Sequence, residues 1–262
     1  MNLDLMIENG QLLLILFARI FALLRVAPLL SSSSIPSIAR VGLALFTSFA
    51  VFPWVYEAGY PVPAEGLSYG LILVGEALIG IILGFTLNLI YTAFILAGQY
   101  FSFQMGFGAS QVYDPMAQVQ IPIMGQFLNL IAMLVFVING GFQKLFLIGV
   151  LRSFETTQAS ELALRRGDMM EMIASGIGLM FEHALILSFP VLGTLLLVSV
   201  SMGLLAKAAP QMNLLMLGFP IKIGIAFLML MLAIPLLMEG FSRLIDESFL
   251  IILEFLAEGG TG

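Results

Sequence analysis

The chain has 262 residues, of which 60% are hydrophobic and 10% are charged, and its mean hydropathy is +1.08. Soluble domains carry roughly 25% charged residues, so this composition predicts an integral membrane protein and argues against a soluble domain. The formal net charge is -6 and the ten basic residues form no block, so we expect no nucleic-acid partner. The sequence has no cysteine, which excludes disulfides, thiolate metal sites and cysteine nucleophiles.

Apolar runs separated by polar breaks predict about six helices. A helix needs about 20 residues to cross the roughly 30 Å hydrocarbon core, and these runs do not alternate in polarity as the strands of a membrane barrel do. The N-terminus lacks a basic region and a clean cleavage site, so we expect the first run to stay in the protein. The sequence predicts an all-α membrane protein whose long, kinked helices form hairpins within one domain over 1–262. The runs lie at about 11–30, 41–56, 70–97, 121–138, 176–205 and 214–238.

The first apolar run carries two arginines, Arg19 and Arg25. Ionisable groups in such runs cost about 2.5–3.5 kcal/mol on insertion scales and usually face a partner or a cavity. Because the two arginines are six residues apart, they lie on different faces of a helix. We expect two separate anchors.

The third run carries a stripe of small and polar residues. Such residues let a second helix approach closely and bond across the contact. The partner helix can belong to the same chain or to another subunit, and the sequence leaves both readings open. The stripe recurs every four residues at Glu76, Gly80, Gly84, Asn88 and Thr92.

The stretch FQMGFGASQVYDP, at 103–115, interrupts the apolar runs with glycines and aromatic residues. Irregular backbone at membrane depth lines a cavity or is buried in protein, so this loop can occlude a pore, whereas the simpler reading is a connector at the membrane surface. Glycines permit a tight fold, and an aspartate before proline favours a turn. The candidate plug residues are Phe103, Met105, Gly106, Phe107, Gly108, Tyr113, Asp114, Pro115 and Met116.

The last two runs contain a few further ionisable groups. Glu182 and His183 are adjacent, so they point about 100° apart on a helix, and we favour ion pairs that stabilise the assembly over a proton relay or pore lining. Lys222 lies two residues after Pro220, and it can bond the carbonyl groups that a proline leaves without a donor. The densest basic cluster, at Arg152, Arg165 and Arg166, predicts a cytoplasmic loop and cytoplasmic termini.

Enzyme chemistry has little support in this sequence. The GFG at 106–108 begins like a dinucleotide fingerprint, but Gln111 replaces the third glycine and no βαβ unit surrounds it. The single histidine lies in an apolar run, without a nucleophile motif or a metal-spaced cluster. We expect no catalytic residue, cofactor or metal.

Three blocks of the sequence resemble one family of bacterial membrane proteins. They are RVAPLLSSSSIPSIARVGLAL at 25–45, MGFGASQVYDP at 105–115 and APQMNLLMLGFPIKIG at 209–224. In their order and spacing they are similar to the FliR/SctT family of type III secretion export gates, and the resemblance spans nearly the whole chain.

The resemblance implies a fold, partners and a role. One FliR-like chain joins several copies of FliP and FliQ, near FlhA and FlhB, in the bacterial inner membrane at the flagellar basal body. A FliP-like part over 1–138 and a FliQ-like part over 139–262 are implied, with 104–120 as the pore plug. The gate would pass unfolded flagellar export substrates, and its helices would contact membrane lipid. A stand-alone transporter or channel, a scaffold without a conduit, and an injectisome homologue are the alternatives.

Overall fold

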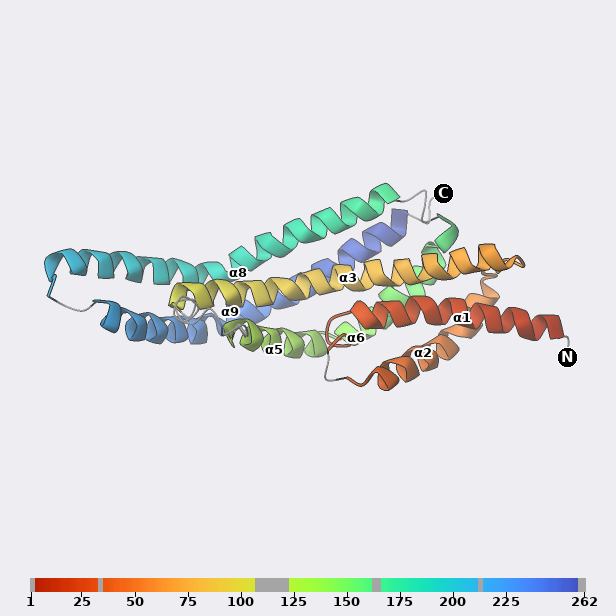
Figure 1. The fold of residues 1–262 in the computed structure, drawn as a ribbon, viewed down its shortest axis with the longest axis horizontal. Coiled ribbons are helices and arrows are strands. Elements are labelled where there is room, and N and C mark those ends of the chain that lie inside the picture. Colours follow the sequence, from red (N-terminus) through yellow and green to blue (C-terminus); the bar gives the residue numbers. More distant parts are fainter. Residues whose placement is uncertain (1–2, 33–34, 107–122, 162–165, 212–213, 259–262) are drawn as a thin grey trace. The chain divides into compact units, whose positions relative to one another are not determined.

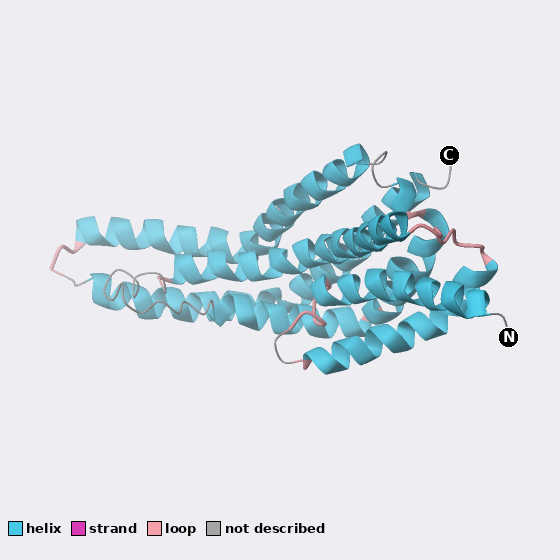
Figure 2. Cartoon of the chain, turned by 45° about the vertical axis from the view of Figure 1, so that its right-hand side comes forward, coloured by secondary structure: helices cyan, strands magenta, loops and turns pink. Residues whose placement is uncertain are grey.

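The computed structural model describes residues 3–32, 35–106, 123–161, 166–211 and 214–258. These residues form helices joined by short connections, and none of them lies in a β-strand (Figure 1, Figure 2). In chain order, the elements are α1 (Leu3–Val26), α2 (Ser37–Glu57), α3 (Gly66–Met105), α5 (Ile123–Ile138), α6 (Gly141–Lys144), the π-helix η1 (Leu145–Arg152), α7 (Ser153–Thr156), the 3₁₀-helix η2 (Ala159–Glu161), α8 (Arg166–Ala208) and α9 (Leu214–Glu258).

Five of the described helices are long and apolar enough to cross a membrane, namely α1, α2, α3, α8 and α9. A sixth span results if α5 is counted together with the short helices of 141–156, which follow it after a break of a few residues. The predicted all-α membrane fold with long apolar helices is confirmed.

Several helices extend beyond their predicted ends. The last helix was predicted to end at 238, but α9 continues to Glu258. Glutamate and arginine favour helix, and Glu239 pairs with Arg243 one turn later, so the polar residues that end an apolar run do not end the helix. The prediction that 103–105 belong to an irregular loop was also wrong, because Phe103 and Met105 lie in the last turn of α3.

The chain divides into two compact units, and three long helices contribute to both. Unit 1 contains Met1–Ile90, Gly140–Ile177 and Ile245–Gly262. Unit 2 contains Tyr91–Asn139 and Gly178–Leu244. The two units therefore do not follow the order of the sequence.

Unit 1 is built around one face of α1. Ile15, Leu16, Ile20 and Leu23 of this helix are fully buried, with the spacing of a helix that buries one broad stripe. The first part of α3 and the last part of α9 also contribute buried aliphatic and aromatic side chains, which include Ile79, Leu83, Phe249, Ile252 and Leu256.

The connection between α1 and α2 is held by an arginine. Leu29 adopts a left-handed conformation with φ of 68°, and the turn leaves carbonyl groups that no helix satisfies. The buried side chain of Arg40 donates to the carbonyl oxygen of Leu30 at 2.7 Å and also to those of Ser31 and Ser32. Arg40 thus closes the turn that precedes its own helix.

Unit 2 has an aromatic core. The rings of Phe94 and Phe241 lie 4.1 Å apart between centroids, and the ring of Tyr91 packs edge-on against Phe94 and Phe136. A Cβ at Gly98 of α3 would overlap the backbone of Gly125 in α5, so these two helices touch backbone to backbone.

Candidate functional site

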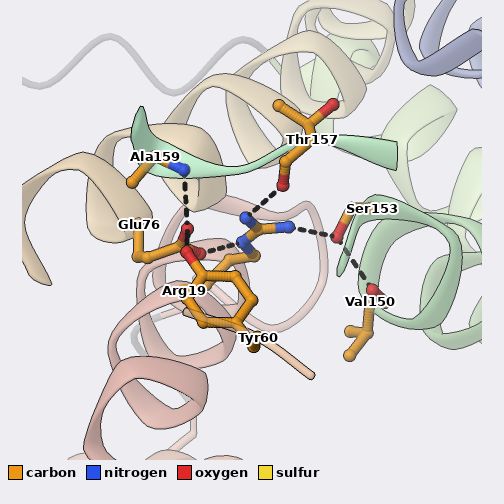
Figure 3. Close-up of polar contacts among 7 residues, drawn as sticks. All are labelled: Arg19, Tyr60, Glu76, Val150, Ser153, Thr157 and Ala159. Carbon is orange, nitrogen blue, oxygen red and sulfur yellow. Dashed lines mark hydrogen bonds and ion pairs between the residues drawn. The ribbon is translucent and has the colours of Figure 1, made fainter. Parts of the chain in front are cut away.

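A buried ion pair lies in unit 1, between α1 and α3 (Figure 3). Arg19 donates from Nε to Glu76 Oε2, and the two residues are 1% and 0% exposed. Charges so completely removed from solvent are stable only with good geometry and further hydrogen bonds.

The remaining polar atoms of this pair find partners on two segments, the α2–α3 connection and the segment after η1. Arg19 donates to the hydroxyl of Ser153 at 3.1 Å and to the carbonyl oxygen of Thr157 at 2.7 Å (Figure 3). Glu76 Oε1 accepts from the Tyr60 hydroxyl at 2.6 Å and from the backbone N–H of Ala159 at 3.0 Å. We call these six residues the ionic cluster, and it joins α1, the α2–α3 connection, α3 and the segment after η1.

Two neighbouring aromatic residues complete the environment of the ionic cluster. The guanidinium carbon of Arg19 lies 4.0 Å above the centroid of the Phe154 ring, a cation–π geometry. Tyr60 lies in the connection between two spans, and burial raises the pKa of its phenol, with the Glu76 carboxylate raising it further. The phenol therefore stays protonated and remains a donor to Glu76.

The small-residue stripe of α3 explains how these charges meet. A Cβ at Gly80 would overlap the carbonyl oxygen of Arg19, and one at Gly84 would lie 2.9 Å from the carbonyl oxygen of Leu23. The two glycines therefore lie directly against the backbone of α1, within the same chain. Because Glu76 is one turn before Gly80, this close approach brings the Arg19 side chain to the carboxylate. Asn88, farther along the stripe, is half-buried.

The predicted plug begins at a constrained position in unit 2. Gly106 follows α3 with φ of 91°, and a Cβ there would overlap the ring of Phe219 on α9. Met105 is 2% exposed and packs beside Phe101 and Met124, whereas Phe103 is 63% exposed. The other predicted plug residues lie outside the described residues, namely Phe107, Gly108, Tyr113, Asp114, Pro115 and Met116.

The remaining predicted charges differ in their exposure. Arg25, in the last turn of α1, and Glu182, on α8, are exposed, whereas His183 and Lys222 are half-buried. Lys222 makes no hydrogen bond or ion pair to any described residue, so the bond to carbonyl groups freed by Pro220 is not formed. It lines a cavity with Phe219.

Sequence comparison identifies the family. Residues 11–248 match the model of the family described as bacterial export proteins, family 1. The chain belongs to this family. Flagellar biosynthetic protein FliR of Bacillus subtilis is 31% identical over 86% of this chain and 86% of its own length. FliR of Borreliella burgdorferi is 30% identical over 98% of this chain and 94% of its own. Surface presentation of antigens protein SpaR of Salmonella typhimurium is 27% identical over 94% and 91%.

The expected resemblance to the FliR/SctT family is thus confirmed across most of the chain. Among the residues that the structure describes, no group of three or more His, Asp or Glu side chains is arranged to hold a metal ion.

Three functional contacts were missed from the sequence. Arg19 was identified as an ionisable group in an apolar run and Glu76 as a member of the stripe, but the two were not paired, although opposite charges in apolar runs often pair. Arg40 gave no signal, because its role depends on the turn before it. Phe219 lies within the resemblance block at 209–224, but its contact with Gly106 joins positions far apart in sequence.

Proposed function

We propose that this chain is a subunit of the type III secretion export gate. One copy assembles with several copies of FliP and FliQ, near FlhA and FlhB, into the channel that passes unfolded flagellar subunits across the inner membrane. The observation that carries the proposal is the match to FliR proteins along nearly the entire chain, with 30% identity over 98% of it. The parts over 1–138 and 139–262 correspond in this proposal to a FliP-like and a FliQ-like half, and their boundary falls at the break between α5 and α6.

The structure of unit 2 supports a plug that starts at the end of α3. Met105 is enclosed by apolar side chains, and Gly106 contacts the Phe219 ring in a conformation that favours glycine. The segment after Gly106 therefore starts from a fixed anchor. In our proposal, residues 104–120 block the channel by apolar packing and dewetting until a substrate displaces them.

The ionic cluster has a supporting role in this proposal. It fixes α1 against α3 in unit 1, so that the long helix keeps its axial position when substrate passes. Arg19 and Glu76 then serve as an internal brace, whereas export energy comes from other components of the system.

The assembly is tested by the native mass of the complex that copurifies with a tagged chain from its own host after gentle detergent extraction. We expect one copy of this chain with several copies of two other small membrane proteins. A stable monomer or symmetric homo-oligomer without partners would contradict the gate and favour the stand-alone transporter.

The plug is tested by deleting residues 106–112 and measuring ion leakage across the membrane. We expect leakage to rise when the assembled complex has its normal mass, because the seal is lost. The same deletion in cells that lack the partner subunits is the control, since a leak there would come from the isolated chain. A tight membrane with a fully assembled complex would refute the plug.

Flagellar and injectisome roles are separated by complementation. FliR relatives reach 31% identity, whereas SpaR is 27% identical, so we favour the flagellar system. Expression of this chain should restore motility to a strain of its host that lacks its own copy. Restored secretion through an injectisome without motility would assign it to that system instead.

A further inference from the structure

A groove of unit 2 lies between the end of α8 and the beginning of α9. Its volume is about 300 Å³. Small side chains form much of its wall, and Ser199, Gly203 and Ala206 follow one another at helical spacing on α8. The facing wall on α9 is formed by Gly218, Phe219 and Lys222.

Lys222 is a positively charged residue of this groove, and it has no counterion among the residues that the structure describes. It is half-buried and bonds to no described residue. From His183 to Met238 the sequence contains two lysines, no arginine and no acidic residue. The hairpin of α8 and α9 therefore cannot supply a carboxylate for Lys222 from its own apolar portion, although the whole chain has a net charge of -6.

The groove is shaped for a close helical contact. A Cβ at Gly203 would meet no atom within 4 Å, so the small side chains leave space rather than filling it with their own packing. Large exposed apolar side chains are next to lining residues in the sequence: Val200, Leu204 and Ile221 are 53%, 67% and 42% exposed. Small residues allow membrane helices to approach closely, and an ionisable group in an apolar surface usually pairs with an opposite charge.

We infer that this groove docks an apolar helix of a partner subunit, and that a carboxylate on this helix pairs with Lys222. The inference rests on the proposed assembly and identifies one of its contacts. A lipid phosphate could also neutralise a lysine, but a flexible acyl chain can pack against side chains of any size. Small residues such as serine, glycine and alanine matter for the close approach of a second helix. The structure favours the helix because the free space lies over the small residues beside the charge.

Three variants test the contact by complementary means. Lys222→Met removes the charge while keeping an apolar chain of similar length, and Lys222→Arg keeps the charge. Gly203→Leu fills the groove, where the added side chain meets open space in the isolated subunit. Lys207→Met is the matched control, because Lys207 is an exposed lysine of the same hairpin that does not line the groove.

The measurement is the amount of each partner subunit, and of bound lipid, in the native mass spectrum of the complex extracted from its own host. We expect Lys222→Met and Gly203→Leu to reduce recovery of one partner by about tenfold or more, since truncating one member of a buried charge pair weakens an interface strongly. Lys222→Arg and Lys207→Met should retain it. A photo-crosslinking amino acid at Met202, which also lines the groove, should capture the same partner.

The measurement distinguishes three ways in which the inference can be wrong. If the unmodified chain is recovered without partners, the proposed assembly itself is wrong. If the unmodified chain carries its partners and all variants carry them equally, the assembly stands and the docking inference is overturned. If Lys222→Met loses an anionic lipid while every partner remains, the groove binds lipid and helix docking is likewise overturned.

Discussion

Replacing Arg19 by methionine should strongly destabilise unit 1. The change leaves Glu76, which is 0% exposed, without its counterion, and breaking a buried pair in this way costs about 3–5 kcal/mol. The carbonyl oxygen of Thr157 also loses the hydrogen bond from Arg19, whereas the Ser153 hydroxyl keeps its bond to the carbonyl oxygen of Val150. Tyr60 and Ala159 still donate to Glu76, so we expect a cost near the lower limit, about 3 kcal/mol.

The chain contains its own reporter for this experiment. Its single tryptophan, Trp54, lines a cavity of unit 1 together with Tyr60 and Phe154, next to the ionic cluster. Thermal unfolding in detergent, followed by tryptophan emission, should show a midpoint lower by roughly 6–12 °C for a loss of about 3 kcal/mol. Arg25→Met is the control, because this exposed arginine of the same helix should change stability by no more than about 0.5 kcal/mol.

The double variant Arg19→Met with Glu76→Gln separates charge burial from packing. If the unpaired carboxylate causes most of the loss, removing its charge should recover stability, and the double variant should be more stable than Arg19→Met alone. A midpoint for Arg19→Met equal to that of the unmodified chain would refute the assignment of the ionic cluster as a brace. A double variant less stable than the single one would show that lost hydrogen bonds and packing, rather than the buried charge, dominate.

Three further changes probe the contact between α1 and α3 in unit 1 and the end of α3 in unit 2. Tyr60→Phe removes the 2.6 Å bond to Glu76 and should cost about 1–2 kcal/mol, read from the tryptophan melt; no change would mean that the bond contributes nothing net. Gly80→Ala places a Cβ against the backbone of α1 and should destabilise by about 1–3 kcal/mol, whereas Gly70→Ala, in open space on the same helix, should be neutral or stabilising; equal melts for the two would argue against the close helix contact. Gly106→Ala strains a left-handed position and collides with Phe219, so the assembled complex should leak ions faster; an unchanged leak rate would indicate that the anchor does not control the seal.

Hydropathy located the helices but not their ends. Hydropathy reports how readily a segment transfers into lipid. A helix, in contrast, continues wherever its backbone hydrogen bonds can form, and charged residues such as Glu239 and Arg243 favour the helical state. The predicted spans therefore coincided with the apolar parts of α3, α8 and α9, while the helices themselves continued farther. For the same reason, Phe103 and Met105 were placed in a loop although they are helical.

For the stripe on α3, the sequence likewise predicted one property and left another to the structure. Its spacing identified Gly80 and Gly84 as a packing face, but nothing in one helix specifies which other helix will cover that face. The structure places α1 there. The identity of the partner depends on the path of the chain between the two helices, which a local pattern does not record.

The sequence by itself determined that this is a membrane protein of long helices, that it is similar to FliR export proteins, and that a few charges and small residues lie within apolar runs. These properties depend on composition, local periodicity and shared motifs, so each can be read along one segment. Only the tertiary structure decided that Arg19 meets Glu76, that Arg40 closes the first turn and that Gly106 meets Phe219. It also decided that Lys222 has no counterion within the described part of the chain. Such contacts join residues from different helices, and their energies arise only when packing brings the groups together and removes them from solvent.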